Sequence, residues 1–176
     1  CIVNLKRHAF EIYEKLDRLS AEGLYHLSTN MCPKHRDDVL RTVRERLESN
    51  EPCRLVSTQC VEAGVDLDFP TVFRAFGPLD AIAQASGRCN RSGKAETRTV
   101  HVFVPEDERY PTRAYQQATT VTELLLKRYG ERMDISDPEI FVAYYKELYD
   151  IARPETHSRE LQDAIKTLDF EKAARE

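Results

Sequence analysis

The chain has 176 residues, of which 41% are hydrophobic and 32% are charged. This balance is ordinary for a folded globular domain and too hydrophobic for a disordered chain. The length suits one domain with a small helical appendage. The net charge of -4 excludes nucleic-acid binding by bulk positive charge. Any such contact therefore requires a local groove of amides, hydroxyls and a few basic side chains.

The odd number of cysteines argues against a disulfide framework. They stand at Cys1, Cys32, Cys53, Cys60 and Cys89, and no CxxC pair occurs. We therefore expect free thiols in a reducing cytoplasm and no zinc site, and the five histidines form no metal-ligand pair either. No apolar run is long enough to span a membrane and no signal peptide is present, so we expect a cytoplasmic protein without membrane contact. The first strand looks truncated at Cys1, so we expect a piece of a longer protein.

Strand-like and helix-like segments alternate through the first hundred residues. We expect strands at residues 1–4, 24–27, 53–57, 71–75 and 99–104, with helices at residues 6–20, 33–47 and 78–90. Strands that alternate with helices predict βαβ units, and hence an α/β fold with a parallel sheet flanked by helices. We assign this domain to residues 1–105.

A different pattern follows Pro105, and it predicts a short all-helical extension over residues 106–176. A polar linker at residues 106–111 precedes helices at about residues 112–129, 138–151 and 157–174. The middle helix carries the apolar residues Ile140, Phe141, Tyr144, Tyr145 and Leu148. Core packing is the favoured interpretation of this stripe, and base stacking is the alternative.

The most informative segment runs from Gln84 to Arg91, with the sequence QASGRCNR. On a helix or a helix-to-loop end, Gln84, Arg88 and Arg91 fall within a narrow wedge, since successive residues turn by about 100°. Arginine stays charged and grips phosphate oxygens bidentately, while Gly87 lets a backbone or a phosphate come close. The pattern therefore suits a polyanionic ligand. The alternative is a solvated basic helix end.

A second segment, STQCVEAGVD at residues 57–66, follows directly on an apolar strand. Ligands of open α/β sheets sit at the carboxyl ends of the strands, where hydroxyls and amides can hold a phosphate backbone. Asp66 follows a glycine turn and can accept a ribose hydroxyl. The alternatives are that Asp66 is a turn residue after Gly64, or that Asp66 or Asp68 forms a salt bridge with the arginines.

Together these segments resemble the motifs of superfamily 2 helicases. STQCVEAGVDLDFP resembles motif V, QASGRCNRSG resembles motif VI, and IVNLKRHAFEIYEKL resembles motif IV with its following helix. LSTNMCPKHRDDVLRTVRERL is similar to the segment between motifs IV and V. Over residues 1–104 the chain is similar to the second RecA-like motor domain of the CRISPR-associated helicase–nuclease of type I systems. The helical tail resembles that family less specifically.

This resemblance implies a role for each matching residue. It places Arg88, Arg91 and Gln84 at the γ-phosphate of ATP; Asp66, Gly64 and Gly87 at the nucleotide; and Ser28, Thr29, Thr58 and Gln59 on the DNA backbone. It implies an ATP-dependent 3′-to-5′ single-stranded DNA helicase acting in CRISPR interference. The implied partners are a first motor domain, a nuclease domain, single-stranded DNA and a crRNA-guided surveillance complex.

A P-loop and a magnesium-holding acidic motif are missing from the sequence. The stretch from Gly87 to Lys94 imitates a P-loop, but it is one residue too long between its glycines and continues into Ala95. We therefore expect ATP and Mg²⁺ as cofactors, with the Mg²⁺ ligands on the first motor domain, and an inactive chain when it stands alone. Two alternatives stay open: half of a superfamily 2 RNA helicase, or a catalytically idle docking module.

Overall fold

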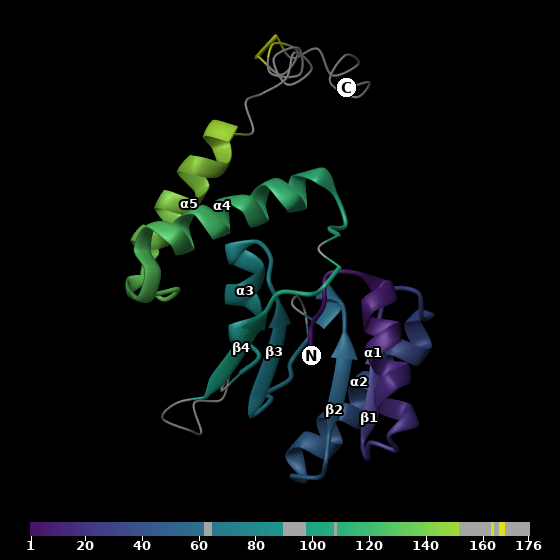
Figure 1. Ribbon diagram of the computed structural model, residues 1–176. Coiled ribbons are helices and arrows are strands. Elements are labelled where there is room, and N and C mark those ends of the chain that lie inside the picture. Colours follow the sequence, from purple (N-terminus) through teal and green to yellow (C-terminus); the bar gives the residue numbers. More distant parts are fainter. Residues whose placement is uncertain (62–64, 90–97, 108, 152–162, 164–165, 168–176) are drawn as a thin grey trace.

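The computed structural model describes residues 1–61, 65–89, 98–107, 109–151, 163 and 166–167 (Figure 1). The strands are β1 (Leu24–Leu27), β2 (Arg54–Ser57), β3 (Thr71–Ala75) and β4 (Thr99–Phe103). The helices are α1 (Lys6–Arg18), α2 (Pro33–Glu48), α3 (Leu79–Ser86), α4 (Arg113–Tyr129) and α5 (Pro138–Ile151). Two 3₁₀ turns, η1 (Gln59–Val61) and η2 (Gly130–Arg132), complete the described elements.

The four strands are parallel and form two pairs, β1 with β2 and β3 with β4. Residues 1–4 lie between the pairs, because Ile2 bridges both Ser57 of β2 and Arg74 of β3. The Val3 amide donates to the Ser57 carbonyl at 2.9 Å, and the Ala75 amide donates to the Ile2 carbonyl at 2.9 Å. The predicted parallel sheet is therefore confirmed, and its N-terminal segment, residues 1–4, pairs between the two strand pairs through isolated bridges at Ile2.

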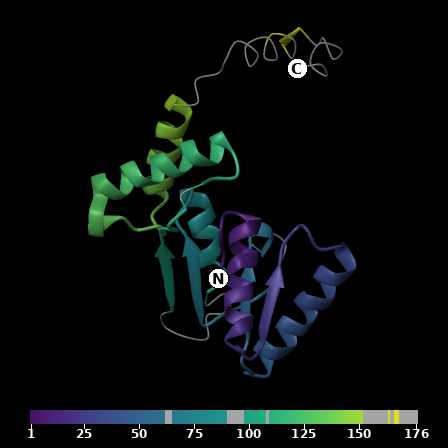
Figure 2. The same ribbon diagram turned by 45° about the vertical axis from the view of Figure 1, so that its right-hand side comes forward.

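Helices cover both faces of the sheet (Figures 1 and 2). Neighbouring residues of β2 point to opposite faces, as the pleat requires. Leu55 packs in a cluster with Val43 of α2, whereas Val56 packs with Ala9 of α1. The sheet is thus the middle of three layers, which confirms the expected α/β architecture.

One predicted helix is shorter than expected. The helix predicted at residues 78–90 begins at Leu79 and ends at Ser86, and Gly87 caps it. The chain leaves the helix because the Phe69 amide donates to the Arg88 carbonyl at 2.9 Å, and Phe69 and Cys89 form a parallel bridge ahead of β3. Arg88 is therefore a turn residue and does not share a helical wedge with Gln84.

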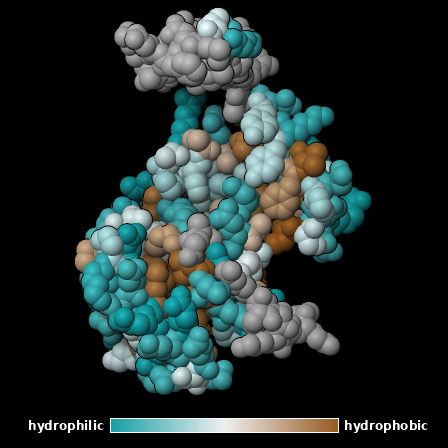
Figure 3. All heavy atoms as spheres, turned by 180° about the vertical axis from the view of Figure 1, so that it is seen from behind, coloured by the Kyte–Doolittle hydropathy of each residue, from teal (hydrophilic) through white to brown (hydrophobic). Residues whose placement is uncertain are grey.

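The extension packs on α3 through one apolar cluster. Leu79 lies there with Val121 and Leu125 of α4 and with Ile140 and Tyr144 of α5. Core packing of the α5 stripe is thereby confirmed for its buried members. Exposed hydrophobic side chains remain on the extension, among them Leu124, Leu126, Val142 and Ile151, and hydrophobic patches are visible over it in Figure 3. Most of the helix predicted at residues 157–174 lies outside the described residues.

None of the helices in the described part of the chain is long and apolar enough to cross a membrane.

A buried hydrogen-bond network joins α4 to the sheet. The Arg74 guanidinium, fully buried, donates to Asn4 Oδ1 at 2.7 Å, to the Ala75 carbonyl at 2.8 Å and to the Tyr115 hydroxyl at 2.9 Å. The Tyr115 hydroxyl in turn donates to Asn4 Oδ1 at 2.8 Å. Because buried polar groups must be paired, this network fixes the start of α4 on the N-terminal segment, residues 1–4.

Replacing Tyr115 with phenylalanine tests that network. We predict that Tyr115→Phe lowers the free energy of unfolding by about 2 kcal/mol, because it removes an acceptor from a buried guanidinium. Tyr149→Phe is the matched control, since Tyr149 is 73% exposed and its change should cost less than about 0.5 kcal/mol. Chemical denaturation of both variants measures the difference, and equal losses would contradict the assignment.

Gly23 occupies a turn that tolerates no side chain. Its φ is +63°, and a Cβ there would lie 1.8 Å from the Pro52 carbonyl oxygen. We predict that Gly23→Ala lowers the free energy of unfolding by more than about 3 kcal/mol, because it adds a backbone clash to an unfavourable φ. Gly87, with φ of -65°, is the control, and Gly87→Ala should cost less than about 1 kcal/mol. Thermal or urea unfolding that ranks the two variants the other way would refute this prediction.

Candidate nucleotide and nucleic-acid sites

The residues predicted to bind nucleic acid follow the carboxyl ends of two paired strands. β1 ends at Leu27 and β2 ends at Ser57, and these two residues are partners in the strand register. The Thr58 amide donates to the Leu27 carbonyl at 3.3 Å, which continues the pairing beyond β2. The structure therefore brings together, at one edge of the sheet, the predicted residues Ser28, Thr29, Thr58 and Gln59.

Three of these four residues line an open groove of about 760 Å³, and they are Thr29, Thr58 and Gln59. Ser28 is only 1% exposed and is not among the lining residues, so its side chain contributes to packing rather than to the groove surface. The remaining lining residues are Asn4, Leu5, Lys6, Arg7, Cys60, Arg109, Pro111, Thr112 and Tyr115. The groove thus combines hydroxyl, amide and basic groups, which suits a phosphate backbone.

The lining residues are held in place by hydrogen bonds. Gln59 Nε2 donates to the Asn4 carbonyl at 3.3 Å. The Thr58 hydroxyl donates to Cys60 Sγ at 3.6 Å, and Cys60 Sγ donates to the Leu27 carbonyl at 3.5 Å. Side chains that are oriented before a ligand binds lose little freedom when it does.

Three basic residues of the groove, Lys6, Arg7 and Arg109, were not predicted from the sequence. For Lys6 and Arg7 a signal was present, because they follow closely on the segment predicted as a strand at residues 1–4, as Thr29 follows β1. Arg109 gave no such signal, since it reaches the groove only through the return of the linker after β4.

Asp66 lies away from the groove. It is exposed and borders a cavity of about 590 Å³ whose lining includes Pro52 and Cys53, just ahead of β2. Asp66 is therefore at the amino end of β2, whereas Thr58 is at the carboxyl end. The expectation that Asp66 lies at the carboxyl ends of the strands is therefore wrong, because the loop after η1 carries it back along the sheet. Asp68, beside it, forms an ion pair with Arg98 at 3.2 Å.

Arg88 connects the two motif-like segments. Its side chain is half-buried, and Nε donates to the Val61 carbonyl of η1 at 3.0 Å. η1 begins at Gln59, so one short turn contacts both Arg88 and the groove. The predicted arginine is thus placed against the segment that carries Thr58 and Gln59.

Gln84 and Gly87 are exposed at the end of α3. A Cβ at Gly87 would meet only the Gln84 carbonyl oxygen at 3.4 Å and the Ala83 carbonyl oxygen at 3.8 Å. The described part of the fold therefore does not require a glycine there. Gly64 and Arg91 lie outside the described residues.

In the part of the chain that the structure describes, no group of three His, Cys, Asp or Glu side chains is arranged to hold a metal ion.

Comparison with known proteins points to one family. The profile of the family described as CRISPR-associated nuclease/helicase Cas3, C-terminal, matches residues 1–94. A CRISPR-associated nuclease/helicase Cas3 from Haloferax volcanii is 54% identical over 55 residues, which are 31% of this chain and 6% of that protein. Another from Methanothermobacter thermautotrophicus is 22% identical over 176 residues, covering 96% of this chain and 21% of that protein.

Solved structures show the same fold. The chain superposes on the T. fusca Cas3 structure with AMPPNP with a TM-score of 0.64 and 19% identity, covering 98% of this chain and 22% of that one. A chain of a structure titled CRISPR RNA-guided surveillance complex, pre-nicking, gives a TM-score of 0.61 and 20% identity, covering 99% of this chain and 24% of that one.

The chain spans about a fifth or less of the length of these curated relatives. The family profile covers more than half of the chain, and the structural likeness extends through the helical extension. The chain therefore belongs to the family of CRISPR-associated nuclease/helicase Cas3 C-terminal domains.

Proposed function

We propose that this chain is the second motor half of an ATP-dependent 3′-to-5′ single-stranded DNA helicase that acts in CRISPR interference. The observation that carries the proposal is the position of η1. At its start, Gln59 lines the groove, and at its end the Val61 carbonyl accepts a hydrogen bond from Arg88. One turn thus links the residues assigned to DNA with an arginine assigned to ATP.

On the nucleotide side, the proposed site lies between this chain and a first motor domain. Arg88 and Arg91 would serve as finger arginines at the γ-phosphate, with Gln84 beside them. Arginines supplied in this way stabilise developing negative charge and are worth about 10³–10⁵ in rate. Asp66 would contact the ribose, and Gly64 and Gly87, which have no side chains, would let the nucleotide come close. The P-loop and the Mg²⁺ ligands belong on the first motor domain.

On the nucleic-acid side, Thr29, Thr58 and Gln59 would hold the backbone of a single strand. Hydroxyl and amide contacts of this kind carry no base preference, as movement along any sequence requires. A change in the position of Arg88 on hydrolysis would pass through η1 to Thr58 and Gln59. Turnover would thereby be coupled to the grip on the strand.

The wider partners belong to the same proposal. A solved structure of similar fold is titled as a crRNA-guided surveillance complex, which supports recruitment of this protein by such a complex. The relatives are named nuclease/helicases, which supports a nuclease domain working with this motor. With such partners the protein would act in the cytoplasm.

The Arg91→Ala variant tests the motor assignment. In a protein that joins this chain to the first motor domain, we predict that Arg91→Ala lowers DNA-stimulated ATP hydrolysis by at least about 10³-fold, because it removes a charge from the γ-phosphate. DNA affinity should change little. Steady-state ATPase assays with single-stranded DNA measure this loss.

The matched control is Arg41→Ala, because Arg41 is an exposed helix residue paired with Asp38 at 2.6 Å. It should leave turnover unchanged. An Arg91→Ala variant as active as this control would refute the finger assignment. Stimulation by RNA in place of DNA would refute the DNA assignment, and an inactive parent protein would favour a docking module.

A further inference from the structure

The groove lined by Thr29 and Thr58 has two walls. Only one of them comes from the segments that resemble helicase motifs. The other comes from the linker after β4 and from the beginning of α4. Figure 1 shows the linker crossing the carboxyl end of the sheet on its way to α4. The groove-lining residues of this second wall are Arg109, Pro111, Thr112 and Tyr115.

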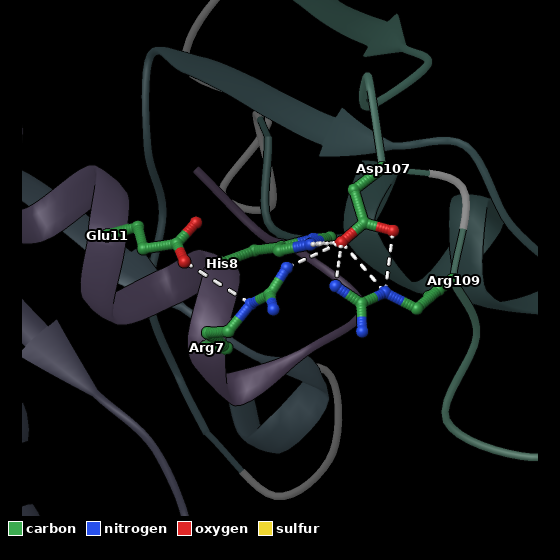
Figure 4. Close-up of polar contacts among 5 residues, drawn as sticks. All are labelled: Arg7, His8, Glu11, Asp107 and Arg109. Carbon is green, nitrogen blue, oxygen red and sulfur yellow. Dashed lines mark hydrogen bonds and ion pairs between the residues drawn. The ribbon is translucent and has the colours of Figure 1, made fainter.

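A single carboxylate ties the two walls together. Asp107 Oδ2 accepts from Arg7 Nη2 of α1 at 2.5 Å and from Arg109 Nη2 of the linker at 2.6 Å (Figure 4). Arg109 Nε lies 2.8 Å from Asp107 Oδ1, and His8 Nε2 lies 3.4 Å from Oδ2. Arg7 also pairs with Glu11 at 3.2 Å. Two guanidiniums from opposite walls are thus held around one anion.

The hydrogen bonds from Arg109 hold the pKa of Asp107 well below its ordinary value, and the hydrogen bond from His8 and the charges of Arg109 and Arg7 add to this effect. Asp107 therefore stays ionised at physiological pH, and it keeps the two arginines together. Asp107 itself does not line the groove.

The groove lining carries three cationic side chains although the whole chain has a net negative charge. Its lining contains the cations Lys6, Arg7 and Arg109, and none of the described lining residues is a carboxylate. The whole chain, by contrast, has a net charge of -4. Local positive charge among hydroxyl and amide groups is what a phosphate backbone requires, since phosphate contacts provide most of the affinity for nucleic acid.

The linker wall is anchored to the sheet at the beginning of α4. The Tyr115 hydroxyl donates to Asn4 Oδ1 at 2.8 Å and accepts from Arg74 at 2.9 Å. It also packs against Gly77, where a Cβ would approach the hydroxyl to 2.7 Å. This anchor holds the beginning of α4, with Thr112 and Tyr115, at the groove.

From this arrangement we infer that the linker completes the single-strand site. Arg109 on the linker and Arg7 on α1 contact phosphates of a strand lying in the groove, and Asp107 positions both guanidiniums. The helical extension therefore takes part in binding nucleic acid through its first residues. This inference rests on the proposed function, and it adds a second wall and a positioning carboxylate to the proposed site.

The test is the salt dependence of single-stranded DNA affinity, measured on the protein that joins this chain to the first motor domain. Loss of one phosphate contact reduces the slope of log K against log salt by about 1. We expect Arg109→Gln to produce this change and to weaken binding about tenfold at moderate salt. Arg109→Lys, which keeps the charge, should retain most of the slope.

The matched control is Arg132→Gln, since Arg132 is exposed on η2 and does not line the groove. It should bind DNA like the parent protein. If the parent binds DNA and Arg109→Gln behaves like Arg132→Gln, the linker wall is refuted while the proposed function stands. If the parent protein itself binds no single-stranded DNA, both the proposed function and this inference are overturned.

Discussion

The described fold depends on the backbone pairing of its first four residues. Without them, β1–β2 and β3–β4 are two separate pairs, and each presents an unpaired edge to the other. Ile2 closes this gap by bridging Ser57 and Arg74. The next polar side chain, Asn4, binds Arg74, Tyr115 and the Phe76 carbonyl, so the same segment also fixes the extension. Sheet, groove and extension thus share one anchor.

This anchoring explains how one small domain can present two separate surfaces. Parallel strands put all their carboxyl ends on one side, where Thr29 and Thr58 meet the linker. α3 runs back across the sheet, and its end places Gln84, Gly87 and Arg88 near the segment that leads into β3. η1 touches both, because Gln59 lines the groove and the Val61 carbonyl accepts a hydrogen bond from Arg88.

The sequence predicted correctly those elements whose first and last residues are determined by their neighbours in the chain. β1 and β3 have the predicted bounds, because each follows directly on a residue that interrupts regular structure, Gly23 before β1 and Pro70 before β3. The end of α3 was misjudged because Phe69 captures the Arg88 carbonyl, a pairing across nineteen residues. Asp66 and Arg109 reach their positions through loops that return along the sheet. The course of such loops is determined by tertiary contacts, so the spacing of residues in the sequence did not predict it.

The most direct test of the account is whether the two surfaces bind different ligands. The measurement is the affinity for single-stranded DNA and for an ATP analogue, each in the absence of the other, in a Thr29→Val and Thr58→Val double variant joined to the first motor domain. The account predicts weaker DNA binding with unchanged nucleotide affinity, because both hydroxyls lie at the carboxyl end of the sheet. Weaker nucleotide binding with unchanged DNA affinity would contradict it.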